Sequence, residues 1–355
     1  MIRTDLCNLL GCKYPIVQAA MGPFDTTHLA YAVSNAGGMG VISHPSWDMD
    51  FLRSGFSMTG KDLEGQIAKL KDRAKSSLRI VDDNTDNTFG LNLRVAPEQV
   101  DVPQLLDTIL EEREKSPSMK RKFRLFISSA GDPAQEILKK VKRAGLIWFH
   151  TCSTVYHAKK AVQAGVDGLI VTGFEAGGHV GLESNHTMVL VPAVVRSVDV
   201  PVIAGGGIAT GAQMAAALAL GAKGIYMGTR FIATDEHEFH PRAKEAIVTA
   251  KQRFPRGNTT VVAEGIFGTL RHLRNKYSEG LYKLWMSGAD RRDIQEYEAD
   301  GFVKGVGEEG DIENGGLFAG QAVILLDKIK PAKEVIDSIL EEAEEVLKEA
   351  PKFLC

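Results

Sequence analysis

The sequence predicts an α/β protein built as a closed (β/α)₈ barrel, with a second, smaller and mostly helical domain inserted after the eighth strand. Eight short and nearly continuous apolar runs recur before residue 232, and stretches with helical character separate them. Parallel strands that are buried on both faces have this composition. Eight strand–helix units in succession favour a closed barrel over an open sheet, and 355 residues are enough for the barrel and an insertion.

We expect one strand at each apolar run. The runs are Pro15–Ala20, Met39–Ser43, Phe89–Val95, Leu125–Ala130, Leu146–Cys152, Gly168–Gly173, Val200–Gly206 and Gly224–Thr229.

Four of the intervening stretches have clear helical signals. Residues 132–145 begin with Asp-Pro and end on a glycine, and residues 153–165 begin with serine and also end on a glycine. Residues 210–222 are rich in small side chains, which suits close packing on a barrel wall. Apolar residues at helical spacing in 332–350 predict a packing helix with a solvated acidic face.

Two segments exceed what a barrel needs. Residues 44–61 form a long aromatic loop after the second strand, on the face where barrel active sites are built. Residues 232–314 follow the eighth strand and are predicted to form a helical insertion or lid domain. The barrel domain would then consist of residues 1–231 and 315–355.

Composition excludes several classes of partner. A net charge of −3 without a basic stripe argues against nucleic acid. No run of about 18 apolar residues predicts a membrane span, and the N-terminus lacks a signal-peptide core, so we expect a cytoplasmic protein. Four cysteines without a CxxC pair predict neither a disulfide framework nor a metal site. A homodimer is compatible with the sequence, which does not fix the oligomeric state.

Glycines at the ends of the last two strands indicate a phosphate site. The seventh strand ends in "AGGGIATG" with Gly206 and Gly207, and the eighth ends in "MGTRF" with Gly228 and Thr229. These two loops hold a phosphate in many barrels, because their backbone N–H groups are accessible. Tight turns explain each glycine run alone equally well.

Polar side chains also occur inside apolar strands. Asn92 lies in the third strand and Ser128 in the fourth. Buried amides and hydroxyls need hydrogen-bond partners. The edge of a flat heteroaromatic ligand would supply them, and so would ordinary bonds within the protein.

The segment "GFEAGGHVG", residues 173–181, offers the strongest catalytic candidate. Its two glycines allow a ligand to approach the backbone, and His179 is able to take or give a proton near neutral pH. Glu175 is expected to cap a turn or bind a cofactor. His150 and Cys152 end the fifth strand and are weaker candidates, since no activating sequence surrounds the cysteine.

Together these motifs resemble the flavin-dependent nitronate monooxygenase family, formerly called 2-nitropropane dioxygenases, which includes FMN-dependent enoyl-acyl-carrier-protein reductases. The resemblance covers most of the chain. The matching segments are "PIVQAAMGPFDTTHLAYAVSNAGGMGVIS", "GLN" at 90–92, "EAGGHVG" at 175–181, residues 201–231 and "GDIENGGLFAGQ" at 310–321. One departure is visible, because the family commonly has proline where Ala20 stands.

The resemblance implies a TIM barrel that holds one FMN, with His179 as the active-site histidine. The residues that it assigns to the cofactor are Ala20, Met21, Gly22, Asn92, Ser128, Glu175, Gly177, Gly178, Gly206, Gly207, Gly228, Thr229 and Gln321. It implies oxidation of alkyl nitronates by O₂ to a carbonyl compound and nitrite. The alternative is an enoyl-thioester reductase that uses NAD(P)H at the same FMN site. A flavin-binding barrel without turnover is a third reading, and the intact His179 argues against it.

Overall fold

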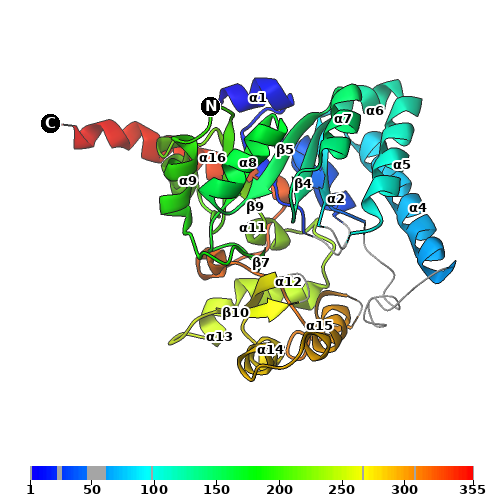
Figure 1. Cartoon of the computed structure of the whole chain (residues 1–355). Coiled ribbons are helices and arrows are strands. Elements are labelled where there is room, and N and C mark those ends of the chain that lie inside the picture. Colours follow the sequence, from blue (N-terminus) through cyan, green and yellow to red (C-terminus); the bar gives the residue numbers. More distant parts are fainter. Residues whose placement is uncertain are drawn as a thin grey trace.

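The protein is described from a computed structural model, which covers residues 2–21, 26–45, 61–96, 99–265, 268–307 and 309–354. A barrel ringed by helices forms the larger part, and a second layer of helices and strands lies beneath one end of it (Figure 1). The two layers place the site between them.

All eight expected strands are confirmed. They are β1 (Ile16–Gln18), β2 (Gly40–Ile42), β3 (Phe89–Arg94), β4 (Phe123–Ser129), β5 (Ile147–Cys152), β6 (Gly168–Thr172), β8 (Val202–Gly205) and β9 (Gly224–Met227). They pair in the order β1-β9-β8-β6-β5-β4-β3-β2, and every pair is parallel. A further parallel bridge between Val17 and Met39 joins the two ends of this order, which brings the sheet to closure as a barrel.

The apolar runs form strands because both faces of this sheet are buried. Successive side chains alternate between two clusters: Ile127 and Phe149 belong to the cluster of the barrel interior, whereas Phe126 and Trp148 pack toward the surrounding helices. A strand that is buried on both sides shows no polar alternation, which is why its sequence is continuously apolar.

Helices surround the barrel. They are α1 (Asp5–Leu10), α2 (Thr27–Asn35), α4 (Lys61–Asn84), α5 (Val102–Lys115), α6 (Pro117–Lys122), α7 (Gln135–Arg143), α8 (Val155–Ala164), α9 (Thr187–Val195), α10 (Gly211–Ala219), α11 (Thr229–Ile232) and α16 (Ala332–Glu349), with 3₁₀ turns at Gln321–Leu325 and Ala350–Phe353.

The four predicted helices are present, with differences at their ends. Thr154 rather than Ser153 caps α8, because its hydroxyl accepts from the N–H of His157 at 3.0 Å. The α7 helix begins three residues after Asp132 and has no side-chain cap. The predicted C-terminal packing helix is α16, which buries its apolar face in the main core.

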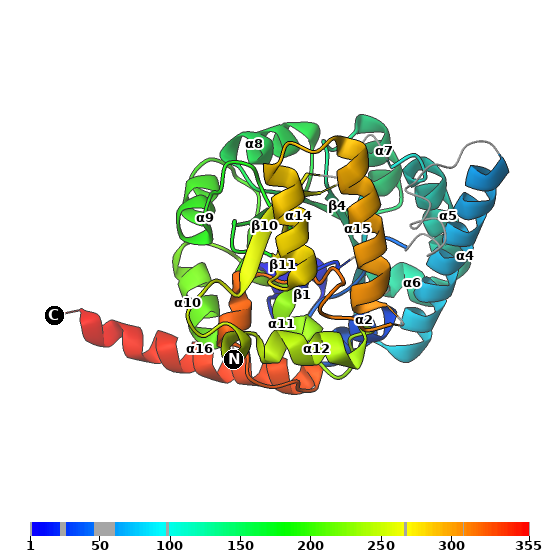
Figure 2. The same ribbon diagram turned by 90° about the horizontal axis from the view of Figure 1, so that it is seen from below.

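The second layer is not purely helical. Residues 232–314 contain α12 (Pro241–Val248), α13 (Ala250–Arg253), α14 (Lys276–Met286) and α15 (Arg291–Val306), but also the antiparallel strands β10 (Thr260–Gly265) and β11 (Gly268–Leu273). The two-residue strand β7 (Gly178–His179) joins β11, which makes a three-stranded sheet. Viewed from below, α14, α15 and β10 lie across the end of the barrel (Figure 2). The division into two domains stays a prediction.

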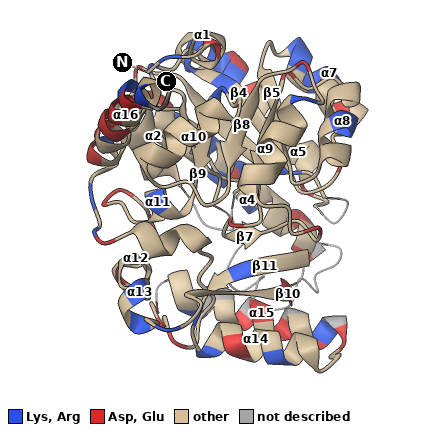
Figure 3. Ribbon diagram, turned by 90° about the vertical axis from the view of Figure 1, so that its left-hand side faces the viewer, with Lys and Arg blue, Asp and Glu red and all other residues tan. Residues whose placement is uncertain are grey.

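Charge is concentrated on the helices. Lysines, arginines and acidic residues mark α14, α15 and α16, whereas the barrel strands are largely uncharged (Figure 3). Within the described ranges, no helix has the length and apolar character needed to cross a membrane. Nor do the described residues include a cluster of His, Cys, Asp or Glu able to hold a metal ion. The predicted aromatic loop 44–61 lies almost entirely outside the described residues.

Candidate active site

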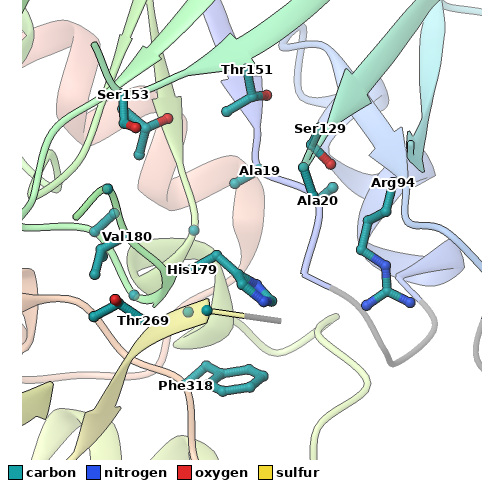
Figure 4. A pocket seen from close by; sticks show the side chains of 18 of the residues that line it. Ala19, Ala20, Arg94, Ser129, Thr151, Ser153, His179, Val180, Thr269 and Phe318 are labelled. Atoms are coloured by element: carbon teal, nitrogen blue, oxygen red, sulfur yellow. The ribbon is translucent and has the colours of Figure 1, made fainter. Parts of the chain in front are cut away.

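A cavity of about 1570 Å³ lies between the carboxyl ends of the barrel strands and the second layer. Strand-end residues line it, and Glu264, Thr269, Trp285 and Phe318 close it from the other side. Figure 4 shows several of these side chains around the cavity. Ligand pockets typically measure roughly 300–1,000 Å³, so this cavity has room for a cofactor and a substrate together.

The predicted glycine loops form an anion cradle in this cavity. Gly206, Gly207, Gly228 and Thr229 line it, and the first two have left-handed φ values of 97° and 74°. The N–H groups of the three glycines make no hydrogen bond within the described part of the chain. Backbone donors that converge without partners favour an anion. The Thr229 hydroxyl accepts from the N–H of Gly320 at 2.9 Å, so it supports a neighbouring loop.

The turn after β1 forms another part of the cavity wall. Ala20 and Met21 line the cavity, and their N–H groups donate to Tyr226 Oη and Ser43 Oγ, each at 2.8 Å. These bonds fix the turn without the proline that is common in the family. Gly22 lies outside the described residues.

Three predicted cofactor residues do not line the cavity. The Glu175 carboxylate accepts from the N–H and hydroxyl of Thr187 at 3.0 and 2.9 Å, which caps the start of α9. The backbone N–H of Gln321 donates to the Glu175 carbonyl at 2.9 Å, and the neighbouring Ala322 lines the cavity instead. Ser128 is fully buried within the wall of the barrel. Glu175 and Gln321 therefore stabilise the loops of the site through hydrogen bonds and do not line the cavity themselves.

Two different structural constraints require glycine at the two positions before His179. A Cβ on Gly177 would lie 2.6 Å from backbone atoms of Ala319 and Gly320, so close packing requires glycine there. Gly178 has a φ of 69°, which a larger residue rarely adopts. Both line the cavity, and they let β7 lie against β11, where His179 pairs with Leu270.

His179 projects into the cavity, and its environment keeps the ring neutral. Its side chain points into the cavity, as Figure 4 shows, and it is exposed to that space. Removal from bulk water, with a contribution from the positive charge of Arg94, lowers the pKa of His179 to about 4. A neutral imidazole at pH 7 accepts a proton readily, which suits a general base.

A second imidazole, that of His150, lines the cavity and belongs to a buried chain of hydrogen bonds. The Trp148 indole N–H donates to Ser128 Oγ at 2.7 Å, and Ser128 Oγ lies 2.8 Å from Nδ1 of His150. The indole N–H occupies one lone pair of this oxygen, and either the hydroxyl proton or the second lone pair joins it to Nδ1. Burial lowers the pKa of His150 to about 4, so the ring is neutral.

Replacing Ser128 with alanine is expected to lower the free energy of unfolding by about 1–3 kcal/mol, because the buried Trp148 N–H loses its acceptor. Urea denaturation of the two proteins measures the difference. Ser197→Ala is the matched control, since the Ser197 hydroxyl donates to the Ala193 carbonyl near the end of α9 and leaves no buried donor when it is removed. An equal loss in both variants would contradict the role of the buried chain.

Cys152 lines the cavity but is not a nucleophile in this setting. Burial raises the pKa of its thiol to about 12, so the reactive thiolate is scarce at neutral pH.

Other polar side chains line the cavity. Asn92 donates to Ser129 Oγ at 3.0 Å and to the Ile127 carbonyl at 3.2 Å, so the protein partly satisfies it. Thr151 and Thr172 also line the cavity, but their hydroxyl oxygens are buried in its wall, and neither has a hydrogen-bond partner in the described part of the chain. Buried hydroxyls are usually bonded, so these two are unusual features of the wall.

Some cavity residues were not predicted from the sequence. Arg94 follows Asn92 by two positions on β3, and strand alternation places both on the same face, which is a signal that could have identified it. Tyr226 of β9 also lines the cavity. Glu264 and Trp285 come from the second layer, where pairing of distant segments decides the position and no local signal exists.

A barrel whose strand ends combine an anion cradle and a neutral imidazole in one deep cavity defines a ligand-binding site of the kind found in α/β-barrel enzymes. Comparison with known proteins specifies the class. The family model named nitronate monooxygenase matches residues 3–342. The chain therefore belongs to the nitronate monooxygenase family.

The relatives are oxidoreductases by name. A (3aS,4S,5R,7aS)-5-hydroxy-7a-methyl-1-oxo-octahydro-1H-indene-4-carboxyl-CoA dehydrogenase of Rhodococcus jostii is 30% identical, over 96% of this chain and 96% of that protein. A probable nitronate monooxygenase of Staphylococcus aureus is 27% identical, over 97% of this chain and 98% of that protein. The structure of FabK from Thermotoga maritima has 32% identity and a TM-score of 0.79, over 100% of both chains. The chain is accordingly an enzyme of the oxidoreductase type.

Proposed function

We propose that this enzyme is an FMN-dependent nitronate monooxygenase. The observation that carries the proposal is the meeting of the glycine cradle and the neutral His179 in one cavity. In net terms, two nitronate anions and one O₂ give two carbonyl compounds and two nitrite ions. Each carbon gains one oxygen atom, and each C–N bond breaks.

The residues present fit an FMN. The unbonded N–H groups of Gly206, Gly207 and Gly228 would hold its phosphate. The side chains of Asn92, Thr151 and Thr172 line the cavity and would contact the rest of the molecule. When bound, FMN supplies an acceptor for substrate electrons that is able to pass them on to O₂.

His179 would handle the substrate proton. A nitroalkane that enters as its neutral tautomer must lose the proton on the carbon beside the nitro group. The neutral imidazole of His179 accepts it, and this yields the nitronate within the cavity. The second layer, through Trp285 and Phe318, limits the entry of water.

A thioester oxidoreductase is the second candidate. The size of the cavity favours it, because a small nitronate fills little of about 1570 Å³. The Rhodococcus jostii relative is also named as a CoA-thioester dehydrogenase. The reductive form of this activity would use NADH or NADPH.

Anaerobic mixing separates the two candidates. The holoenzyme is mixed with propyl nitronate, NADH, NADPH or a saturated acyl-CoA, and bleaching of the flavin absorbance is recorded. We expect rapid bleaching with propyl nitronate. Rapid bleaching by a pyridine nucleotide or acyl-CoA, without a response to nitronate, would replace the first candidate with the second.

The neutral state of His179 also predicts the pH dependence. A base works only while unprotonated, so kcat/KM for a neutral nitroalkane should persist below the ordinary histidine pKa of 6.5 and fall as pH drops through about 4. Buried His272 stays neutral over this range, since burial and then His179 lower its pKa to about 3. The other charged or titratable groups that line the cavity are His44, Arg94, Asp132, His150, Cys152, His157, Glu183, Tyr226 and Glu264. An activity that instead rises toward pH 4 would identify His179 as a proton donor.

A further inference from the structure

Arg94 places a positive charge in the cavity. It is the last residue of β3, it is half-buried, and its guanidinium projects into the cavity on the side toward which the His179 ring points (Figure 4). The electrostatic effect of Arg94 on His179 supports their proximity.

No carboxylate among the described residues forms an ion pair with this guanidinium, although Asp101 lies near enough to favour its charge. Within the described residues, Arg94 makes no ion pair and no side-chain hydrogen bond, and its Nε is buried without a partner. The neighbouring carboxylate, Asp101, bonds instead to His44 Nε2 at 2.8 Å. His44 Nδ1 in turn accepts from the backbone N–H of Arg94 at 3.2 Å. Asp101 and His44 therefore hold the backbone of Arg94 and leave its guanidinium donors available.

The available donors do not belong to the anion cradle. In the closed strand order, β3 and β8 are separated by three strands in one direction, and by three in the other. Arg94 and the Gly206–Gly207 loop consequently lie on opposite sides of the barrel mouth. A phosphate held by the cradle would therefore not contact Arg94, and its donors remain available to a second anionic group.

We propose that Arg94 binds the anionic oxygen atoms of the substrate and orients its reacting carbon toward His179. This inference rests on the proposed function and deepens it. The two oxygen atoms of a nitronate are spaced like those of a carboxylate, which the planar fork of arginine binds with two parallel hydrogen bonds. The same contact stabilises the negative charge that develops on the nitro group as its carbon loses a proton.

Anion binding can be measured without turnover. Butanoate has the shape and charge of propyl nitronate but does not react, and butanamide is its uncharged counterpart. Calorimetric titration of the holoenzyme should show tighter binding of butanoate than of butanamide. Arg94→Met should weaken butanoate binding by about 10–100-fold and abolish the preference, because charge-assisted hydrogen bonds are lost.

Two further variants and a control complete the test. Arg94→Gln supplies a second uncharged side chain, and Arg94→Lys keeps the charge without the fork, so it should retain part of the preference. Arg196→Met is the matched control, since Arg196 lies exposed at the end of α9 and outside the cavity lining. The KM for propyl nitronate should rise in Arg94→Met by more than kcat falls.

The outcomes distinguish the two proposals. Unchanged butanoate binding in Arg94→Met and Arg94→Gln would overturn the role of Arg94, whatever substrate the enzyme uses. Loss of the butanoate preference in an enzyme that never oxidises nitronate would uphold anion binding by Arg94 and reject nitronate as the substrate.

Discussion

Replacing His179 with alanine is expected to slow turnover of a neutral nitroalkane by about 10²–10⁴-fold, because a positioned proton acceptor contributes about that factor. Preformed propyl nitronate has already lost the proton, and its turnover should fall less, by roughly tenfold, through loss of a contact to the substrate. The cofactor should remain bound, since the backbone N–H groups of the glycine cradle are unchanged. Steady-state rates with both substrates and the flavin absorbance of the purified variant provide the measurements.

His28→Ala controls for the loss of an imidazole elsewhere. His28 is exposed at the start of α2 and does not line the cavity. Its removal should leave both rates unchanged. An equal loss of both rates in His179→Ala would show that the residue positions substrate and takes no part in proton removal, and unchanged rates would remove it from the mechanism.

The barrel could be predicted because its strands carry their signal locally. Each strand is buried on both faces, so a continuous apolar run such as that of β6 is enough to mark it. The second layer carries a different signal. Strand β10 pairs with β11, and β11 also pairs with β7, about 90 residues earlier in the chain. No local pattern in 173–181 specifies that contact. The prediction of a mostly helical insertion therefore missed strands β10 and β11.

The site could be predicted where it depends on the backbone. Parallel strands of a barrel bring their carboxyl ends together, so glycines at the ends of β8 and β9 had to meet in space. Side-chain direction was harder to predict. Ser128 and Ser129 are adjacent in the sequence, and strand alternation sends one into the wall and the other into the cavity. The register of β4 against its neighbouring strands decides which of the two serines faces the cavity. Amino-acid composition carries no information about that register.

Gly206→Ala is expected to weaken cofactor binding by about 10–100-fold. The substitution displaces a backbone N–H that would donate a hydrogen bond to the charged phosphate. A Cβ at this position would lie 2.7 Å from the backbone N and O of Gly173 and 2.9 Å from Thr187 Oγ1. None of these atoms can move easily, since the Gly173 N–H donates to the Gly205 carbonyl at 3.0 Å and the Glu175 carboxylate holds the Thr187 hydroxyl at 2.9 Å. The overlap and the φ of 97° should together destabilise the fold by about 2–6 kcal/mol.

Gly145→Ala separates strain from overlap. Gly145 has a φ of 68° at the end of α7, and a Cβ there would meet no atom within 4 Å. The control should therefore lose only the strain of a left-handed alanine, about 1–2 kcal/mol, and should keep its cofactor. Urea denaturation and the flavin retained after dialysis measure the two effects. If Gly206→Ala keeps its flavin as the control does, the phosphate does not lie against this loop, because the backbone cannot accommodate the added carbon without moving the donor.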